Sequence, residues 1–585
     1  LEELAKVRRQ LGDYKGALEA YERILSFARQ ENYRALILEK RGETLLEAGR
    51  EKEALAQFRE VIQQHPRSYA AYLALQMLDA QGAAQLTELE RGKILYYARQ
   101  YGPCIQALSS YLNSQPDEGA NEAHYYLGLA YEALGQFPQA FQQYDVLIER
   151  HPEDPLTPKA WMAKARAAAA YGGDPSGIYR EFWRHYPGHP QAPLALWLAG
   201  QASERNKAWS LAAEFYHQLY TLYPQDEHAP EARFREGLMA YAQGQKGTAL
   251  ELWQAISLEG LAPEQRARLL TWKGLATQEK DLAQELWQKA HEASPWSYYG
   301  LRARDLLQGS TLRIPADVSP LVPSSALNAA DWRQLQKWAR TLNEEAPGLS
   351  ASQRNIFRQG EMLWKLGWYD KGLEVLRFLQ SQAREDPPAL LELAHLADEL
   401  GAHPITLYCA DRLIYLSGGI SQAPRALLQL AYPTTFGHLV QREAERWAVD
   451  PLLFLALVRQ ESRFNPRAVS HAGAVGLTQV MPETGHWIAA RLGAEEYHPT
   501  LLERPLVSVR YGVWYLGTLL NLYARDWFAA LVAYNAGPGN LKRWTGGQAI
   551  ADPDLFHETL PSSEAKSYLG EIYRQYRVYE SLYRP

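Results

Sequence analysis

Residues 450–482 have the sequence DPLLFLALVRQESRFNPRAVSHAGAVGLTQVMP, and the fold is interpreted outward from this stretch. Asp450 suits an N-cap and Pro451 suits the first helical position, so a helix is predicted to begin here. Asn465-Pro466 predicts its end, because the residue before a proline disfavours helical backbone. The segment that follows from Ser470 is uncharged and rich in glycine, which suits a backbone that closely approaches a ligand.

Glu461 is an acidic residue on the apolar face of this predicted helix. Phe454, Leu457 and Val458 precede it by seven, four and three residues, spacings that place all four side chains on one face. Burial disfavours the charged form of a carboxyl group, so such a Glu can stay protonated near neutral pH and act as a general acid. The alternative is a Glu that is half-exposed or paired with one of the nearby arginines, Arg442, Arg459 or Arg463.

Three motifs in this region resemble, in the same order, those of the soluble lytic transglycosylases, bacterial enzymes that cleave the glycan strands of peptidoglycan. They are QESRFNP at 460–466, GAVGLTQVMP at 473–482 and AYNAGP at 533–538. The resemblance implies an all-α fold, with a tetratricopeptide-like α-solenoid followed by a compact lysozyme-like α-helical catalytic domain.

A repeat of helical hairpins occupies the first four hundred residues. Small residues recur at Cys104, Ala140, Gly177, Ala212 and Ala249, in steps of 36, 37, 35 and 37 residues. In most repeats a glycine stands five positions before the small residue and suits the turn between two helices. One hairpin cannot bury its apolar face alone, so this period indicates stacked hairpins. The pattern resembles degenerate tetratricopeptide repeats and predicts an α-solenoid.

Three domains are predicted: a tetratricopeptide-like α-superhelix at 1–310, a connector with further helical hairpins at 311–430, and a lysozyme-like transglycosylase catalytic domain at 431–585. The Pro- and Ser-rich segment at 310–325, STLRIPADVSPLVPSS, lacks a helical period and is predicted to be a connector or extended loop. Because the last domain contains every motif described above, we expect a fragment from about Ala431 to fold alone.

The resemblance also implies roles for individual residues. Glu461 acts as acid and base, Ser470 and Gln479 are polar partners near the acid or the substrate's acetamido group, Met481 is an apolar wall, and Tyr534 places a hydroxyl beside the carboxyl. The complete set of implied substrate-binding residues is Ser470, Gln479, Met481, Tyr534, Asn535, Glu564 and Tyr568.

The segments ETLP at 558–561 and EAKSY at 564–568 look like the family's closing motif, whose Glu orients parts of the cleft. Two positions depart from the family. Thr478 stands where the family usually has Met, and Lys566 where it usually has Arg. We expect the apolar contact of the Met side chain and the bidentate hydrogen bonds of the Arg guanidinium group to be missing.

Most glycosidases use two carboxyl groups, but the motif positions near Glu461 supply one. The resemblance implies that the N-acetylmuramic acid compensates, its own 6-hydroxyl attacking the anomeric carbon to form a 1,6-anhydro ring as the MurNAc-GlcNAc β-1,4 bond breaks. Such an intramolecular attack needs no bound water. Two alternatives stay open: a lysozyme-like muramidase, which needs a second carboxylate such as Glu564 or Asp526, and an inactive glycan-binding scaffold.

Composition excludes several other classes of protein. The 585 residues are 46% hydrophobic and 22% charged, with a formal charge of −6, which is typical of a soluble globular chain of two or more domains or a repeat array and not of a nucleic-acid binder. The distant Cys104 and Cys409 provide neither a disulfide framework nor a zinc site. We expect no cofactor, no metal, no nucleic acid and no membrane span.

Peptidoglycan glycan strands are the expected partner, with other cell-wall proteins bound through the solenoid. The expected location is the periplasm, the signal peptide having been removed.

Overall fold

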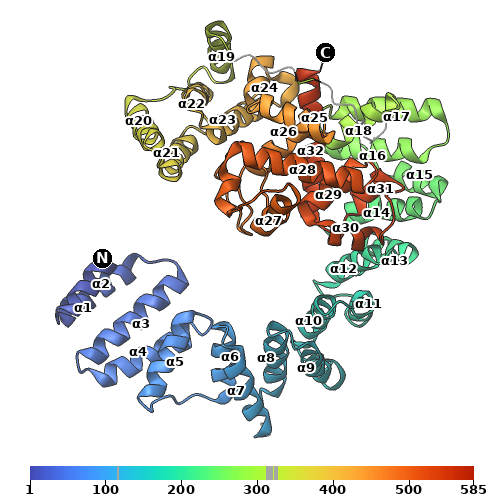
Figure 1. Cartoon of the computed structure of the whole chain (residues 1–585). Helices are drawn as coiled ribbons and strands as arrows, with labels where there is room; N and C mark the ends of the chain where they lie inside the picture. Colours follow the sequence, from blue (N-terminus) through green and yellow to red (C-terminus); the bar gives the residue numbers. More distant parts are fainter. Residues whose placement is uncertain (115–117, 311–319, 322–326, 585) are drawn as a thin grey trace. The chain divides into compact units, whose positions relative to one another are not determined.

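The computed structural model describes residues 1–114, 118–310, 320–321 and 327–584. Within these residues the secondary structure is α-helical, with helices α1 to α32, two short 3-10 helices and isolated β-bridges in place of any sheet (Figure 1). The all-α prediction is therefore confirmed. The predicted connector at 310–325 lies outside the described residues except for Ser310, Pro320 and Leu321.

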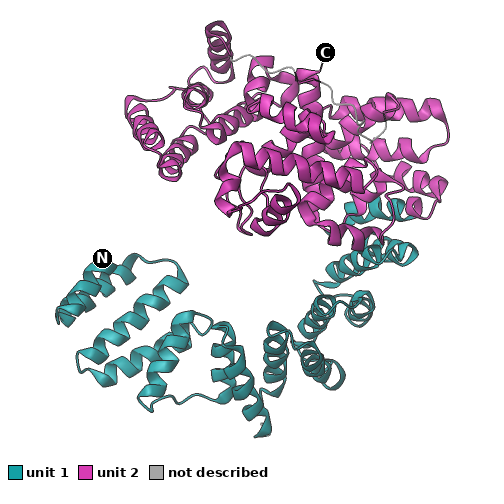
Figure 2. Cartoon of the chain, in the orientation of Figure 1, with its two compact units in different colours: residues 1–239 teal, residues 240–585 magenta. Residues whose placement is uncertain are grey.

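The chain divides into two compact units, Leu1–Met239 and Ala240–Pro585 (Figure 2). We call them unit 1 and unit 2 and describe each by itself. The predicted boundaries near 310 and 430 remain predictions.

Unit 1 is a succession of helical hairpins. Its helices are α1 (Glu2–Gln10), α2 (Tyr14–Phe27), α3 (Glu31–Glu47), α4 (Glu51–Gln64), α5 (Tyr69–Ala80), α6 (Glu88–Tyr97), α7 (Tyr101–Asn113), α8 (Ala120–Ala133), α9 (Phe137–Arg150), α10 (Thr157–Ala170), α11 (Ser176–His185), α12 (Ala192–Arg205), α13 (Trp209–Leu222) and α14 (Ala229–Ala242), whose last residues belong to unit 2.

The packing of these hairpins explains the repeat. Gly135, in the turn between α8 and α9, has φ +71°, a left-handed conformation that glycine adopts without steric cost. Ala140, five residues later, is fully buried. A Cβ on Gly128 of α8 would lie 2.4 Å from the ring of Tyr144 on α9, so the glycine makes room for the aromatic side chain. Lys207 takes the same turn conformation, with φ 57°, in the repeat that lacks the glycine.

Unit 2 continues with hairpins and ends in a compact helical assembly. Its helices are α15 (Lys246–Gln254), α16 (Pro263–Ala276), α17 (Lys280–Ala293), α18 (Tyr298–Leu307), α19 (Ala329–Leu342), α20 (Ala351–Lys365), α21 (Tyr369–Gln382), α22 (Pro387–Glu399), α23 (His403–Leu416), α24 (Arg425–Ala431), α25 (Gly437–Trp447), α26 (Pro451–Ser462), α27 (Pro482–Arg491), α28 (Pro505–Leu522), α29 (Trp527–Ala536), α30 (Pro538–Thr545), α31 (Pro553–Thr559) and α32 (Ser563–Tyr583), with 3-10 helices η1 (Ile420–Gln422) and η2 (Pro499–Glu503).

Helix α26 lies at the centre of this assembly, packed against α25 and α32. Every residue from Pro451 to Arg459 is buried, so the helix is covered on all sides. The sequence predicted a single apolar face, and that prediction underestimated the burial because polar residues such as Arg459 are also enclosed.

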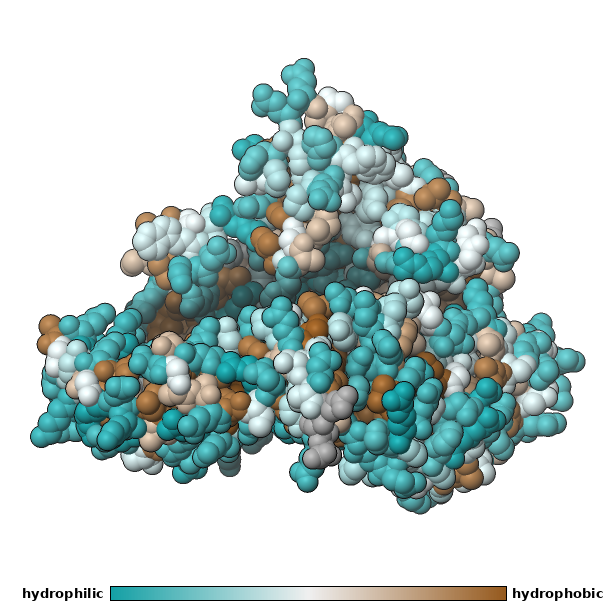
Figure 3. Space-filling model, turned by 90° about the horizontal axis from the view of Figure 1, so that it is seen from below, coloured by the Kyte–Doolittle hydropathy of each residue, from teal (hydrophilic) through white to brown (hydrophobic). Residues whose placement is uncertain are grey.

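The face of the molecule in Figure 3 is mostly hydrophilic, with hydrophobic residues scattered among polar ones. Within the described ranges, each helix is too short or too polar to cross a bilayer.

Candidate active site

The N-terminal end of α26 is set by the residue that the sequence indicated, whereas its C-terminal end lies earlier than the predicted end at Asn465-Pro466. Asp450 caps the N-terminus, its carboxylate accepting hydrogen bonds from the amides of Leu452 at 2.8 Å and Leu453 at 3.2 Å. The helix ends at Ser462, three residues before Asn465, because Arg463 adopts a left-handed conformation with φ 51°. Glu461 thus stands in the last turn, beside a sharp change in chain direction.

The carboxyl group of Glu461 is held by a tyrosine. The hydroxyl of Tyr568, on α32, donates a hydrogen bond to Glu461 Oε1 at 2.5 Å. The pKa of Glu461 is raised to about 7. Burial contributes most to this rise, the negative charge of Glu564 adds to it, and the hydrogen bond from Tyr568 opposes it. Near neutral pH this carboxyl group therefore exists in both protonation states.

The arginines considered as ion-pair partners of Glu461 lie elsewhere. Arg459 pairs with Asp411 at 2.5 Å and also donates to the carbonyl of Ala431 at 2.8 Å. Arg442 lies 3.3 Å from Glu443. The guanidinium group of Arg463 has no hydrogen-bond or ion-pair partner in the described parts of the chain. The interpretation of Glu461 as half of a structural ion pair is therefore not supported.

The loop after α26 is held together by its own polar side chains. Ser470 Oγ accepts a hydrogen bond from the amide of Ala474 at 3.0 Å, and the amide group of Gln479 donates to the carbonyls of Ala468 at 3.0 Å and Gly476 at 2.8 Å. Gly476 has φ +84°, and a Cβ there would lie 2.0 Å from the carbonyl oxygen of Leu502. The glycine thus serves a close backbone contact within the protein.

Tyr534, near the end of α29, donates its hydroxyl to the carbonyl of Thr478 at 2.9 Å. Burial raises the pKa of Tyr534 well above its usual value, and the charge of Glu461 adds to this rise. Tyr534 is therefore close to Glu461, although the hydroxyl bonded to the carboxyl belongs to Tyr568. Asn535 follows on α29 and is partly buried. Met481 is 39% exposed immediately before α27.

Thr478 is fully buried and belongs to the support of the loop. Its hydroxyl lies 3.0 Å from the carbonyl oxygen and 3.1 Å from Oγ of Ser508. A Cβ on Gly512 would lie 2.5 Å from the Thr478 methyl group. Thr478, which stands where Met was expected, therefore fits this position, because Ser508 bonds to its hydroxyl and Gly512 leaves little space for a longer side chain.

Thr478→Met is expected to lower the free energy of unfolding by about 2 kcal/mol, because a longer side chain overpacks this space and the hydrogen bond from the Thr478 hydroxyl to Ser508 is lost. Chemical denaturation measures the change. Thr478→Val is the control that removes the hydroxyl at nearly constant volume. A Met variant as stable as the wild type would show that the pocket can expand.

Glu558 is a buried carboxylate joined to four side chains. Arg268 of α16 donates to it from Nε and Nη2 at 2.7 and 2.9 Å, Trp272 donates at 3.3 Å, and Lys566 lies 2.7 Å away. Tyr299 of α18 also donates its hydroxyl to Glu558. Although burial opposes ionisation, Arg268 and Lys566 hold the pKa of Glu558 well below its usual range. The bidentate fork expected to be missing at Lys566 is supplied by Arg268.

Other contacts join α18 to α31 and α32. Arg302 forms a bidentate pair with Asp554 at 2.7 and 2.8 Å. Asp305 accepts a hydrogen bond from Tyr573 at 2.5 Å and pairs with Arg577. These residues and Arg268 were missed by the sequence reasoning. A signal was available for Tyr299 alone, because it lies in the aromatic segment SPWSYYG at 294–300.

The two carboxylates considered for a hydrolase are placed differently. Asp526 caps α29 by accepting from the amide of Ala529 at 3.1 Å. Glu564 is exposed in the first turn of α32, near enough for its charge to raise the pKa of Glu461. Glu564 is therefore the stronger candidate for a second carboxylate.

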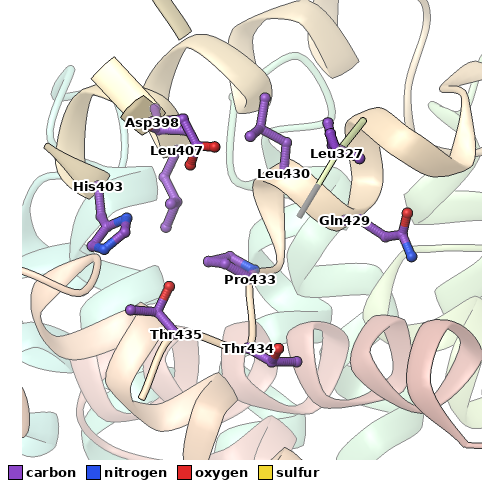
Figure 4. Close-up of a pocket in the computed structure, with 10 residues that line it drawn as sticks. Leu327, Asp398, His403, Leu407, Gln429, Leu430, Pro433, Thr434 and Thr435 are labelled. Carbon is purple, nitrogen blue, oxygen red and sulfur yellow. The ribbon is translucent and has the colours of Figure 1, made fainter. Parts of the chain in front are cut away.

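Two cavities of unit 2 differ in their relation to this site. One, of about 550 Å³, is lined by Gln460 and Arg463, the residues on either side of the Glu461-Ser462 pair. The other, of about 250 Å³, is lined by Asp398 and His403 (Figure 4). Burial raises the pKa of Asp398 and lowers that of His403, but the predicted site residues do not line this second cavity. Groups of three or more potential metal ligands are absent from the described ranges.

Comparison with protein families places the repeats and the candidate site in known classes. Residues 438–556 match the Transglycosylase SLT domain, and residues 2–69 and 122–154 match tetratricopeptide repeats. The chain is 30% identical to the soluble lytic murein transglycosylase of Salmonella typhimurium over 159 residues, 27% of this chain and 24% of that protein. It is 34% identical to the membrane-bound lytic murein transglycosylase C of Actinobacillus pleuropneumoniae over 155 residues, 23% of this chain and 42% of that protein. The chain thus spans about a quarter to under half of the length of these relatives.

Solved structures show a similar fold over nearly the whole chain. An inactive Glu-to-Gln mutant of lytic transglycosylase Slt from Pseudomonas aeruginosa has a TM-score of 0.63 at 18% identity, covering 99% of this chain and 85% of that chain. The 70-kDa soluble lytic transglycosylase in complex with bulgecin A has a TM-score of 0.60 at 16% identity, covering 99% of this chain and 84% of that chain. At these identities the likeness concerns the fold.

Proposed function

We propose that this chain, which joins tetratricopeptide repeats to a transglycosylase SLT domain, is a lytic transglycosylase that cleaves the MurNAc-GlcNAc β-1,4 bond of peptidoglycan. The observation that carries the proposal is the state of Glu461. Its partly buried carboxyl group lies in a domain of this class, with a pKa of about 7 and a hydrogen bond from Tyr568. A carboxyl group with this pKa can give a proton and take it back at neutral pH.

In the first step of the proposed reaction, protonated Glu461 gives its proton to the glycosidic oxygen as the bond from that oxygen to the anomeric carbon breaks. The N-acetylglucosamine leaves as an alcohol, and the acetamido group of the muramic acid steadies the positive anomeric centre. In the second step the 6-hydroxyl of the same muramic acid attacks this centre and its proton returns to Glu461. The product is a 1,6-anhydro ring, and water is not consumed.

The surrounding residues have supporting roles in this proposal. Tyr568 orients the carboxyl group and stabilises its ionised form between the two steps. Ser470 and Gln479 hold the loop that faces the sugar, since their polar atoms already bond to loop amides and carbonyls. Met481 is exposed and provides an apolar wall. Tyr534 fixes the carbonyl of Thr478, and Asn535 and Glu564 line the sugar-binding region.

The hydrolase remains the second candidate, because Glu564 acts electrostatically on Glu461. In that reaction a water molecule held by Glu564 would take the place of the 6-hydroxyl. An inactive scaffold is the less favoured candidate, since both the acid and its tyrosine partner are present.

Incubation with purified sacculi tests whether the chain is an enzyme at all. We expect release of soluble fragments and a fall in turbidity over minutes to hours. Turbidity that stays constant at several pH values, with a protein that is folded by circular dichroism, would favour the scaffold.

Peptidoglycan as substrate places the proposed activity in the periplasm. The repeats of unit 1 are proposed to hold glycan strands or other cell-wall proteins, because stacked hairpins generate extended surfaces suited to long ligands.

The rate of cleavage is expected to fall as the pH rises through about 7. Glu461 must be protonated for the first step, and its protonated fraction falls tenfold for each pH unit above its pKa of about 7. Tyr568→Phe removes a hydrogen bond that lowers this pKa, so its profile of kcat/KM against pH should fall at a higher pH than that of the wild type.

Tyr523→Phe is the matched control, since Tyr523 is a partly buried tyrosine of the same domain that is not among the groups shifting the pKa of Glu461. Its pH profile should coincide with that of the wild type. A Tyr568→Phe profile that is unchanged or displaced to lower pH would contradict the proposed effect of Tyr568 on Glu461.

A further inference from the structure

The cavity of about 250 Å³ in Figure 4 belongs to unit 2 alone. Its walls come from α22, α23 and α24, from the segment before α19 and from the segment between α24 and α25. The described residues that line it include none of those assigned to the candidate active site. Sites for drug-sized ligands measure roughly 300–1,000 Å³, so this cavity suits a smaller molecule.

The wall of this cavity carries a negative charge without a neighbouring cation. Asp398 lines it near the C-terminal end of α22, and neither Lys nor Arg is among the described lining residues. The Asp398 carboxylate makes no hydrogen bond or ion pair within the described ranges. Burial raises the pKa of Asp398, His395 opposes the rise and Glu399 adds to it. Since a helix C-terminus also favours positive charge, the cavity is suited to a cation.

Two further polar side chains face the cavity without a protein partner. Thr406 of α23 is 1% exposed, and its Oγ1 is buried with no hydrogen-bond partner in the described structure. Such an orphan hydroxyl is costly unless a ligand or water satisfies it. His403, one turn earlier on α23, makes no side-chain hydrogen bond among the residues that the structure places. Burial lowers the pKa of His403, so its ring is neutral and one nitrogen can accept a hydrogen bond.

Leucine side chains complete the wall. In the view of Figure 4, Asp398, His403 and Leu407 border the cavity from one side, and Leu327 and Leu430 from the other. Leu407 is 1% exposed and Leu430 5% exposed. An alkyl chain placed against these residues would be removed from water, which favours binding.

We propose that this cavity binds a small aliphatic primary amine in its ammonium form. An ammonium group has three N–H donors and no acceptor, which matches the three acceptors offered by Asp398, His403 and Thr406. The bond to Asp398 joins opposite charges and is the strongest of the three. A neutral ligand such as a sugar would leave the charge of Asp398 uncompensated. The inference is independent of the proposed lytic activity.

The probe is n-pentylamine, which is protonated at neutral pH, and 1-pentanol is its uncharged counterpart of nearly the same size. Isothermal calorimetry with the full chain should show binding of n-pentylamine and about 10-fold weaker binding of 1-pentanol, the size typical of one hydrogen bond to a charged group. Equal affinities would reveal an apolar cavity that does not recognise the cation. That result, or no binding of millimolar n-pentylamine, would overturn the proposal.

Asp398→Asn keeps the size of the side chain and removes its charge, so it should weaken the binding of n-pentylamine about 10-fold. Glu399→Gln is the matched control. Glu399 is the next residue of α22, is exposed, lies 3.6 Å from His395 and is not among the described residues that line this cavity. This control should change the affinity less than about 2-fold. Equal losses from the two variants would indicate attraction to the acidic end of the helix in general and would contradict a defined site.

Thr406→Val tests the buried hydroxyl at nearly constant volume. The Tm of the free protein should not fall, because the variant removes an unsatisfied polar group, whereas the affinity for n-pentylamine should fall about 3-fold with the loss of one hydrogen bond. A lower Tm with unchanged affinity would show that the hydroxyl serves the fold and does not contact the amine.

Two further titrations identify the source of the amine and separate this proposal from the proposed function. Tighter binding of Nα-acetyl-lysine methylamide than of n-pentylamine would assign the cavity to a lysine side chain of a partner protein and would overturn the assignment to a small free amine. Glu461→Gln should bind n-pentylamine with the affinity of the wild type. Loss of lytic activity and loss of amine binding are therefore distinguishable.

Discussion

Glu461→Gln is expected to abolish turnover of peptidoglycan while the protein stays folded. Gln keeps the size of the side chain but has no proton to give to the glycosidic oxygen. A general acid contributes roughly 10²–10⁴-fold to a rate, and here one group serves both steps, so we expect a loss at the upper end of this range or beyond. Release of soluble fragments from sacculi measures the effect.

Two further carboxyl variants make this result specific. Glu483→Gln changes an exposed Glu in the first turn of α27 and should leave the rate unchanged. Glu564→Gln should reduce the rate only moderately if the reaction is that of a transglycosylase. A loss from Glu564→Gln as large as that from Glu461→Gln would instead support a hydrolase with two essential carboxyl groups.

Stability measurements show whether the Glu461 variant is intact. The pKa of Glu461 in the folded protein, about 7, lies above the value of 4.5 for an unperturbed Glu. The unfolded chain therefore releases this proton at lower pH than the folded protein, and the contribution of Glu461 to folding falls as the pH rises from 4.5 to about 7. Because Gln cannot ionise, the variant should become more stable relative to the wild type over this range.

A fragment of residues 431–585 is expected not to fold cooperatively, although it contains every motif of the candidate site. It lacks Arg268, Tyr299 and Arg302, so Glu558 and Asp554 lose their partners on α16 and α18. Removing one partner from a buried ion pair costs roughly 3–5 kcal/mol, a large part of the 5–15 kcal/mol that stabilises a typical protein. The ring of Tyr298, stacked on His557 with centroids 3.9 Å apart, is lost as well.

A fragment of residues 240–585 is the matched control, since it retains all of these contacts within unit 2. Thermal unfolding followed by circular dichroism should show one cooperative transition for 240–585 and none for 431–585. A cooperative transition in the shorter fragment, with cleavage of short glycan, would show that α16 and α18 are dispensable and that the expectation drawn from the sequence motifs was correct.

The hairpin repeat could be predicted from sequence because it depends on local chemistry. Gly135 marks a turn that needs a positive φ, Ala140 marks a close approach of two helices, and both recur at a fixed period. The start of α26 followed in the same way from Asp450 and Pro451.

Part of the candidate site could also be anticipated. An acidic residue between apolar ones indicated a buried carboxyl group, and the raised pKa of Glu461 agrees with that interpretation. The sequence alone did not show which side chain donates a hydrogen bond to this carboxyl group, because several motif positions were candidates. Tyr534 and Tyr568 both lie near Glu461, and spacing along the chain does not show which hydroxyl points at the carboxyl oxygen.

The contacts around Glu558 could not be predicted from sequence. Arg268 precedes Glu558 by 290 residues, and neither a helical period nor a turn motif links positions so far apart. Thr478 shows the same limit at short range, because its partner Ser508 and its tight wall at Gly512 depend on how α28 packs against the loop.

The mass spectrum of the fragments released from sacculi tests the proposed reaction most directly. Attack by the 6-hydroxyl leaves a 1,6-anhydro end, whereas attack by water leaves a reducing end that is heavier by one water molecule. We predict that the wild type releases fragments with 1,6-anhydromuramic acid ends and that Glu461→Gln releases none. Fragments that carry only reducing ends would contradict the single-carboxylate mechanism and identify the protein as a hydrolase.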